Sequence, residues 1–213
     1  MIYPYGTTRN KWDSIIDLDL LWKQYERIIK DNGAIVLFAQ VPFNIILGAS
    51  NLKLLKYEWI WEKPQGTGHL NAKKMPLKKH ENIMVFYKKL PTYNPQMEGD
   101  EVRTVKRTQR KEIKNYGKFI DEEESVYRGR YPKDILKFNK DKDKIHPTQK
   151  PIALLEYLVK TYTNKNEIVL DNCMGSGSTG VACLNTNRKF IGIELDKEYF
   201  EVAKNRINSI KED

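Results

Sequence analysis

A glycine-rich turn between an apolar strand and a helix is the part of this 213-residue sequence whose residue types best suit chemistry. The apolar strand runs into Asp171, Cys173, Gly175 and Gly177. Glycines let the backbone approach a ligand closely, and the N–H groups of the following helix favour a negative group. Glu194 comes nineteen positions after Gly175, at the end of the next apolar strand, where a carboxylate can accept ribose hydroxyls. The pair predicts a site for an adenosine-containing ligand, with a plain strand-to-helix turn as the alternative.

The second candidate is the segment His146-Pro147-Thr148-Gln149-Lys150-Pro151, in which prolines fix the backbone around polar residues. On its own it indicates a rigid helix entry with Thr148 as a cap. His146 has no Cys, Ser or Asp partner at catalytic spacing, and two cysteines suggest neither a disulfide framework nor zinc. We therefore predict no metal site.

Together with Tyr3-Pro4-Tyr5-Gly6, these motifs resemble the DNA amino-methyltransferases with permuted motif order, in which the base-handling half precedes the cofactor-binding half. The resemblance covers nearly the whole chain. It implies S-adenosylmethionine as methyl donor and double-stranded DNA as substrate. The methylated atom would be an exocyclic amino nitrogen, adenine N6 in preference to cytosine N4. A homodimer and a restriction endonuclease partner stay open.

The same resemblance assigns roles to individual residues. The catalytic signature would contain Pro4 and Tyr5, and Glu194 would hold the ribose. The cofactor turn would be formed by Asp171, Cys173, Gly175 and Gly177. The methionine side of the cofactor would be lined by Thr148, Gln149 and Lys150.

The sequence departs from the family at the catalytic signature, which is Asp-Pro-Pro-Tyr or a variant with Ser or Asn first. Here the aligned residues are Ile2-Tyr3-Pro4-Tyr5, and Ile2 cannot accept a hydrogen bond from the target amino group. Tyr5 can still stack on a flipped base. We therefore expect that the chain is truncated or that its start is misassigned. Such a chain would have a sheet with unpaired backbone groups. Its methyl transfer would be very slow or absent. An inactive remnant that binds DNA or cofactor, and a non-catalytic basic DNA-binding module, are the alternatives.

The charge of the chain is consistent with a nucleic-acid partner. The formal net charge is +9, and residues 72–114 hold twelve Lys or Arg against five Asp or Glu. Such a stretch suits a polyanion, although a merely solvated lysine-rich face is the alternative. The predicted phosphate contacts are Lys73, Lys74, Lys78, Lys79, Arg103, Arg107 and Arg110.

The elements that would position these residues alternate between strands and helices. Helices are predicted at 12–31, 42–52, after Pro151, through Ala182 and near 199–210, and strands at 33–39, 55–63, 81–88, 167–170 and 190–194. This order predicts an α/β layered fold with a parallel core. The family resemblance implies that it is Rossmann-like: a mostly parallel sheet of seven strands with helices on both faces and an inserted recognition region. The expected single domain comprises a base-handling half (1–63), a DNA target-recognition insertion (64–140) and a cofactor-binding half (141–213). No apolar run suits a membrane helix or signal peptide, so a cytoplasmic location is expected.

Overall fold

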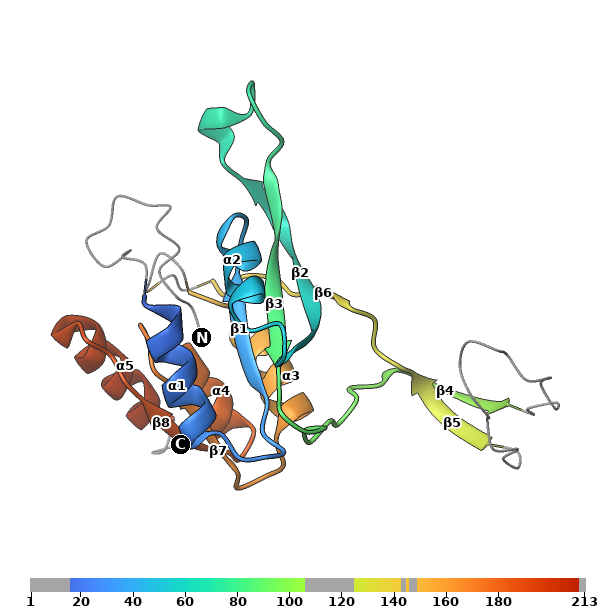
Figure 1. Ribbon diagram of the computed structural model, residues 1–213. Helices are drawn as coiled ribbons and strands as arrows, with labels where there is room; N and C mark the ends of the chain where they lie inside the picture. Colours follow the sequence, from blue (N-terminus) through green and yellow to red (C-terminus); the bar gives the residue numbers. More distant parts are fainter. Residues whose placement is uncertain (1–15, 106–124, 143–144, 146–148, 211–213) are drawn as a thin grey trace. The chain divides into compact units, whose positions relative to one another are not determined.

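The computed structural model of the chain describes residues 16–105, 125–142, 145 and 149–210. It divides into two compact units, the first spanning residues 1–94 and 134–213 and the second residues 95–133. The predicted insertion at 64–140 therefore contributes to both units. Figure 1 shows the elements of each unit.

The larger sheet of the first unit has four strands in the order β1 (Ile35–Ala39), β3 (Lys78–Phe86), β2 (Leu55–Thr67) and β6 (Ile135–Lys137). β3 is antiparallel to both β1 and β2, whereas β6 is parallel to β2. A separate parallel pair joins β7 (Ile168–Asp171) to β8 (Lys189–Gly192).

The α/β fold with helices is confirmed, but the expected mostly parallel pairing is wrong around β3. The connection from β2 to β3 is short, since Thr67 pairs directly with Lys78. A short connection can only reverse the chain, because a parallel partner needs a crossover of a dozen or more residues. The ten-residue link here contains only the single-turn helix η1 (His69–Asn71).

Helices cover both faces of the four-stranded sheet, because the side chains of β1 alternate. Ile35, Leu37 and Ala39 pack with α1 (Leu18–Ile28) and α2 (Phe43–Ser50). Phe38 points to the other face, into a cluster with α3 (Ile152–Tyr162) and α4 (Ser178–Asn185). The last helix, α5 (Lys197–Ser209), follows β8.

A cavity of about 570 Å³ lies between β1 and β7. Residues 35–38 and 168–171 line its two sides, and Ile28 and Leu158 from α1 and α3 close it further. Among the described residues, β1 pairs only with β3 and β7 only with β8. The two strands thus line one apolar space, and within the described ranges they are not paired with each other.

The second unit contains an antiparallel pair, β4 (Glu98–Val105) and β5 (Ser125–Arg130). The hydrophobic periodicity of residues 90–140 is too weak to predict these two strands or β6 from the sequence. Glu101 binds the guanidinium groups of Arg103 and Arg130 at 2.6 and 3.5 Å. In neither unit is any helix of the described residues long and apolar enough to cross a bilayer.

Candidate functional site

The carboxyl end of β7 forms the predicted turn, and Asp171 braces it from inside. Its buried carboxylate accepts the backbone N–H of Cys173 at 3.1 Å and the hydroxyl of Thr179 at 2.6 Å. Thr179 lies in the first turn of α4, so one side chain connects the strand end to the helix start. The sequence suggested Asp171 but gave no signal for Thr179 beyond its place after Gly177.

Glu194 meets this turn, as the nineteen-residue spacing predicted. One carboxylate oxygen accepts the N–H of Gly175 at 2.8 Å, and the other accepts the N–H groups of Leu195 and Asp196 at 2.9 and 3.0 Å. The parallel pairing of Asp171 with Gly192 brings the two strand ends together. A carboxylate has about four lone-pair directions, so a half-buried one of this kind can still accept ribose hydroxyls.

Glycine is required at Gly177 for two reasons. Its φ is +77°, and a Cβ there would lie 2.9 Å from the Cβ of Ala203 on α5. Arg206 of the same helix donates to the carbonyl of Ser176 at 3.1 Å and to the hydroxyl of Ser178 at 3.0 Å. The turn is therefore held from behind by α5, a contact that the sequence did not reveal.

The cysteine in the turn is a neutral thiol. Burial, together with the carboxylates of Asp171 and Glu194, raises the pKa of Cys173 to about 11. A neutral thiol is a poor nucleophile and a poor metal ligand. Within the described ranges no group of three His, Cys, Asp or Glu side chains could hold a metal ion.

The second motif is described only at its end, since Thr148 lies outside the described residues. Gln149 donates to Asp141 at 3.1 Å and accepts the N–H of Ile145 at 3.2 Å. The carboxylate of Asp141 also accepts the N–H of Ile152 at 3.2 Å, which caps the start of α3. Asp141, eleven residues before α3 begins, was missed by the sequence analysis.

Lys150 is buried and points toward the four-stranded sheet. Its ammonium lies 2.8 Å from a carboxylate oxygen of Glu81 on β3 and 5.3 Å from the ring centre of Phe38 on β1. Phe38 also lines the cavity that Asp171 reaches from β7. The carboxyl ends of β1 and β7 thus border one space.

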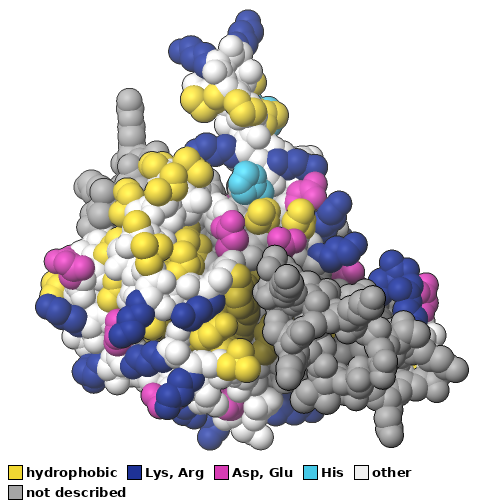
Figure 2. All heavy atoms as spheres, turned by 45° about the vertical axis from the view of Figure 1, so that its right-hand side comes forward, with side chains coloured by type: hydrophobic (Ala, Val, Ile, Leu, Met, Phe, Trp, Pro, Cys, Tyr) yellow, Lys and Arg dark blue, Asp and Glu magenta, His cyan; other side chains and the backbone are white. Residues whose placement is uncertain are grey.

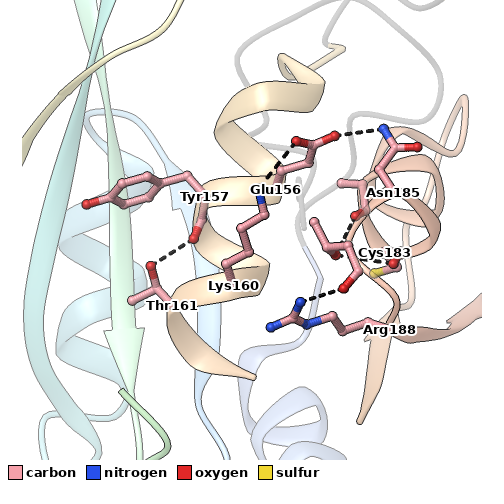
Figure 3. Close-up of polar contacts among 9 residues, drawn as sticks. Glu156, Tyr157, Lys160, Thr161, Cys183, Asn185 and Arg188 are labelled. Carbon is pink, nitrogen blue, oxygen red and sulfur yellow. Dashed lines mark hydrogen bonds and ion pairs between the residues drawn. The ribbon is translucent and has the colours of Figure 1, made fainter. Parts of the chain in front are cut away.

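The helices that follow the two motifs are fastened together. Asn185 of α4 donates to Glu156 of α3 at 2.7 Å, and Glu156 lies 3.8 Å from Lys160 one turn on (Figure 3). From the other side, the hydroxyl of Tyr25 on α1 donates to Asn172 at 2.9 Å. The glycine turn is consequently fixed to α1 and α5, while the helix that follows it is fixed to α3.

The predicted DNA-contacting lysines lie on the β2–β3 hairpin. Lys73 and Lys74 are exposed in its connecting segment, at the top of Figure 1, where Figure 2 shows basic side chains gathered. Lys78 is also exposed, and Lys79 binds Glu62 at 2.8 Å. Arg103 lies in the second unit, whereas Pro4, Tyr5, Arg107 and Arg110 lie outside the described residues.

Known proteins resemble the chain over most of its length. The sequence model of a family described as DNA methylase, of the N6 and N4 methyltransferases, matches residues 4–205. The type II methyltransferase M.HpaI of Haemophilus parainfluenzae is 30% identical over 220 residues, covering 96% of this chain and 64% of M.HpaI. The DNA adenine methyltransferase YhdJ of Escherichia coli (strain K12) is 26% identical over 223 residues, covering 96% and 74%. The chain thus spans less than two thirds of the length of M.HpaI.

A solved structure has the same fold. The crystal structure of the M1.HpyAVI–SAM complex matches with a TM-score of 0.64 and 28% sequence identity. The match covers 96% of this chain and 86% of M1.HpyAVI.

Proposed function

This chain belongs to the DNA methylase family of N6 and N4 methyltransferases, and from that premise we propose that it methylates an exocyclic amino group in double-stranded DNA with S-adenosylmethionine as donor. The observation that carries the proposal is the contact between Gly175 and Glu194. It unites a close-approach turn with a carboxylate suited to ribose, at the carboxyl ends of two parallel strands. The M1.HpyAVI structure, which is similar to this chain, is a complex with SAM.

The residues would divide the cofactor between them. Glu194 would accept the ribose hydroxyls, and Gly175 and Gly177 would allow the backbone to approach the ligand. Asp171 holds the turn in place through Cys173 and Thr179. Bound S-adenosylmethionine would supply an activated methyl group, while Thr148, Gln149 and Lys150 would line or support its methionine end.

Adenine N6 is the proposed target in preference to cytosine N4. The segment Pro4-Tyr5-Gly6 fits the form of the family signature that begins with Asp, and YhdJ is named as an adenine methyltransferase. Prolonged incubation with DNA at high protein concentration, followed by digestion and mass spectrometry, would distinguish the products. N4-methylcytosine in place of N6-methyladenine would contradict the assignment.

Target recognition is proposed for residues 64–140. The support is the cluster of exposed lysines on the β2–β3 hairpin and the separate unit formed within 95–133. A two-stranded ribbon fits the major groove of B-form DNA, and β2–β3 and β4–β5 are both antiparallel strand pairs. Phosphate contacts would position the protein, and base contacts would select the sequence.

Calorimetry with S-adenosylhomocysteine tests the cofactor site without requiring turnover. The Glu194→Gln variant is expected to bind about tenfold more weakly, because a neutral amide accepts the ribose hydroxyls less well. Glu198→Gln, in the first turn of α5, removes the same charge nearby and is expected to leave affinity unchanged. No binding by the parent chain, or equal affinity in Glu194→Gln, would contradict the proposed role.

A further inference from the structure

Three buried charged side chains meet beneath the second motif. Glu81 on β3 lies between Lys150, 2.8 Å from one carboxylate oxygen, and Lys63 of β2, 3.4 Å from the other. The exposed fractions of these side chains are 8% for Glu81, 5% for Lys150 and 3% for Lys63. One carboxylate thus holds two ammonium groups from separate segments.

The cost of burying such charges makes the central carboxylate important. Burial alone would raise the pKa of Glu81, but Lys150 and Lys63 outweigh it, so that this pKa lies below its usual value. Burial lowers the pKa of Lys63 despite the attraction of Glu81. Removing one member of a buried ion pair is strongly destabilising, because it leaves the other charge uncompensated.

We propose that Glu81 is a positioning residue for the cofactor site, which holds Lys150 and so fixes Gln149, Lys150 and Pro151 against β1 and β3. The inference rests on the proposed function. Lys150 serves as a tether in this arrangement, with its ammonium between Glu81 and the ring of Phe38. It thereby acts on the ligand through the placement of its own segment.

Glu81 is connected to the glycine turn through α3 and α4. Lys150 directly precedes Pro151 and α3, and α3 is bonded to α4 through Glu156 and Asn185. The glycine turn leads into α4. Anchoring Lys150 therefore holds the start of α3, and through α4 relates Lys150 and Pro151 to the turn at Gly177.

The chain contains a matched control for this triad. Glu62 also bridges two lysines, Lys79 at 2.8 Å and Lys137 at 3.4 Å, but its side chain is 30% exposed. Glu62→Gln removes the same carboxylate chemistry at the surface, where water screens the lysines left behind. It is expected to bind ligands as the parent chain does.

Two ligands separate positioning from general damage. S-adenosylhomocysteine includes the methionine end, whereas adenosine contains only the part assigned to Glu194 and the glycine turn. In calorimetry, Glu81→Gln is expected to weaken S-adenosylhomocysteine binding by about tenfold or more, since small misplacements of positioning groups are costly. Adenosine binding is expected to change less than about twofold, because the turn keeps its own braces.

Further variants make the result independent of folding defects. Glu81→Asp retains the charge but shortens its reach, and the same selective loss is expected in this milder variant. Lys63→Met leaves the Glu81–Lys150 pair in place and is expected to bind both ligands normally. Circular dichroism would fix a temperature at which every variant compared is fully folded.

The outcomes separate the two claims. If the parent chain binds neither ligand, the proposed function fails and this inference with it. If the parent binds both and Glu81→Gln and Glu81→Asp bind S-adenosylhomocysteine equally well, the positioning role alone is overturned. Equal loss of both ligands, or an equal effect of Glu62→Gln, would also overturn it. Selective loss of S-adenosylhomocysteine in the Glu81 variants supports the tether.

Discussion

At the scale of single residues, the turn depends on a glycine that lacks room for any side chain. Gly177→Ala would place a Cβ 2.9 Å from Ala203 in a left-handed backbone, whereas Gly68→Ala would meet nothing within 4 Å at a similar φ of +95°. We expect Gly68→Ala to cost about 1 kcal/mol and Gly177→Ala at least about 2 kcal/mol more, from overpacking against α5. Urea unfolding of both variants measures the difference. Equal losses in the free energy of unfolding would show that α5 shifts to make room for the added methyl group.

Thr179 is a second residue whose contribution to stability and cofactor affinity can be measured. Thr179→Val deprives the buried carboxylate of Asp171 of a 2.6 Å hydrogen bond. Bonds to charged groups contribute about 1.5–3 kcal/mol, so the free energy of unfolding should fall by that order and cofactor affinity with it. Thr67→Val, which removes an exposed 3.2 Å bond to Lys78, should cost less than about 0.5 kcal/mol. A loss in Thr179→Val no larger than in Thr67→Val would mean that Asp171 finds another donor.

Residues tied to a local pattern were predictable, and residues that act across the fold were not. Glu194 and Gly175 could be paired from sequence because two successive parallel strands place their ends together. Glu81 carried no such signal, since its partner Lys150 is 69 positions away and belongs to another segment. Pro4 and Tyr5 lie outside the described residues. Their role in a catalytic signature therefore stays a prediction from the sequence.

At the scale of elements, the edges of β1 and β7 lead to a prediction about backbone exchange. In the described structure, β3 has a hydrogen-bonded neighbour on both sides, while β1 and β7 each have one. Amides bonded to a neighbouring strand open rarely, whereas unbonded ones exchange with solvent. Hydrogen exchange measured by NMR should therefore protect every amide of residues 82–86 of β3, which pair on both sides, but only alternate amides of β1. Uniform protection along β1 would show that its cavity-facing edge is covered.

Local periodicity predicted the existence of most elements, but the pairing of strands depends on distant residues. The apolar runs at β1 and β7 and the helical stripe of α3 were all expected. The antiparallel direction of β3 follows from its short connection to β2, a feature that strand–helix periodicity does not encode. β6 has only three residues and is stabilised by β2 rather than by its own composition, so no local pattern marks it.

For the molecule as a whole, the buried cysteine thiols predict a loss of folding stability at alkaline pH. Burial raises the pKa of Cys183 from its ordinary value of 9.0 to about 12 and that of Cys173 to about 11. Above pH 9 the unfolded chain releases these protons while the folded chain retains them, so stability falls as pH rises. At pH 10 the loss is about 1.4 kcal/mol for Cys183.

Urea unfolding at pH 8 and pH 10 in a reducing buffer would measure this loss. The Cys183→Ala variant should be less stable at both values but should lose about 1.4 kcal/mol less between them. Burial also raises the pKa of Tyr25 and of Tyr162, so some alkaline loss should persist in the variant. An unchanged pH dependence in Cys183→Ala would mean that this thiol titrates normally.

The net charge of +9 leads us to expect that DNA binds at a particular basic surface, the β2–β3 connection. Each phosphate that the protein neutralises releases condensed counterions, so the slope of log affinity against log salt counts contacts at about 0.9 each. Lys73 and Lys74 are exposed in the β2–β3 connection, whereas Lys79 is already bonded to Glu62. Lys73→Gln with Lys74→Gln should therefore reduce the slope by about two.

The control for this measurement removes the same charge elsewhere on the protein. Lys89, beyond the end of β3 opposite the β2–β3 connection, lies 2.7 Å from Asp31, and Lys204 of α5 lies 3.5 Å from Glu201. Their joint replacement by Gln also lowers the net charge by two, so any effect of overall charge would appear in both variants. We expect the slope to change by less than about half a unit in this control, because paired surface lysines contribute little to a specific phosphate contact. Equal changes in the two variants would mean that DNA is attracted by the diffuse positive field of the molecule, with no binding surface on the hairpin.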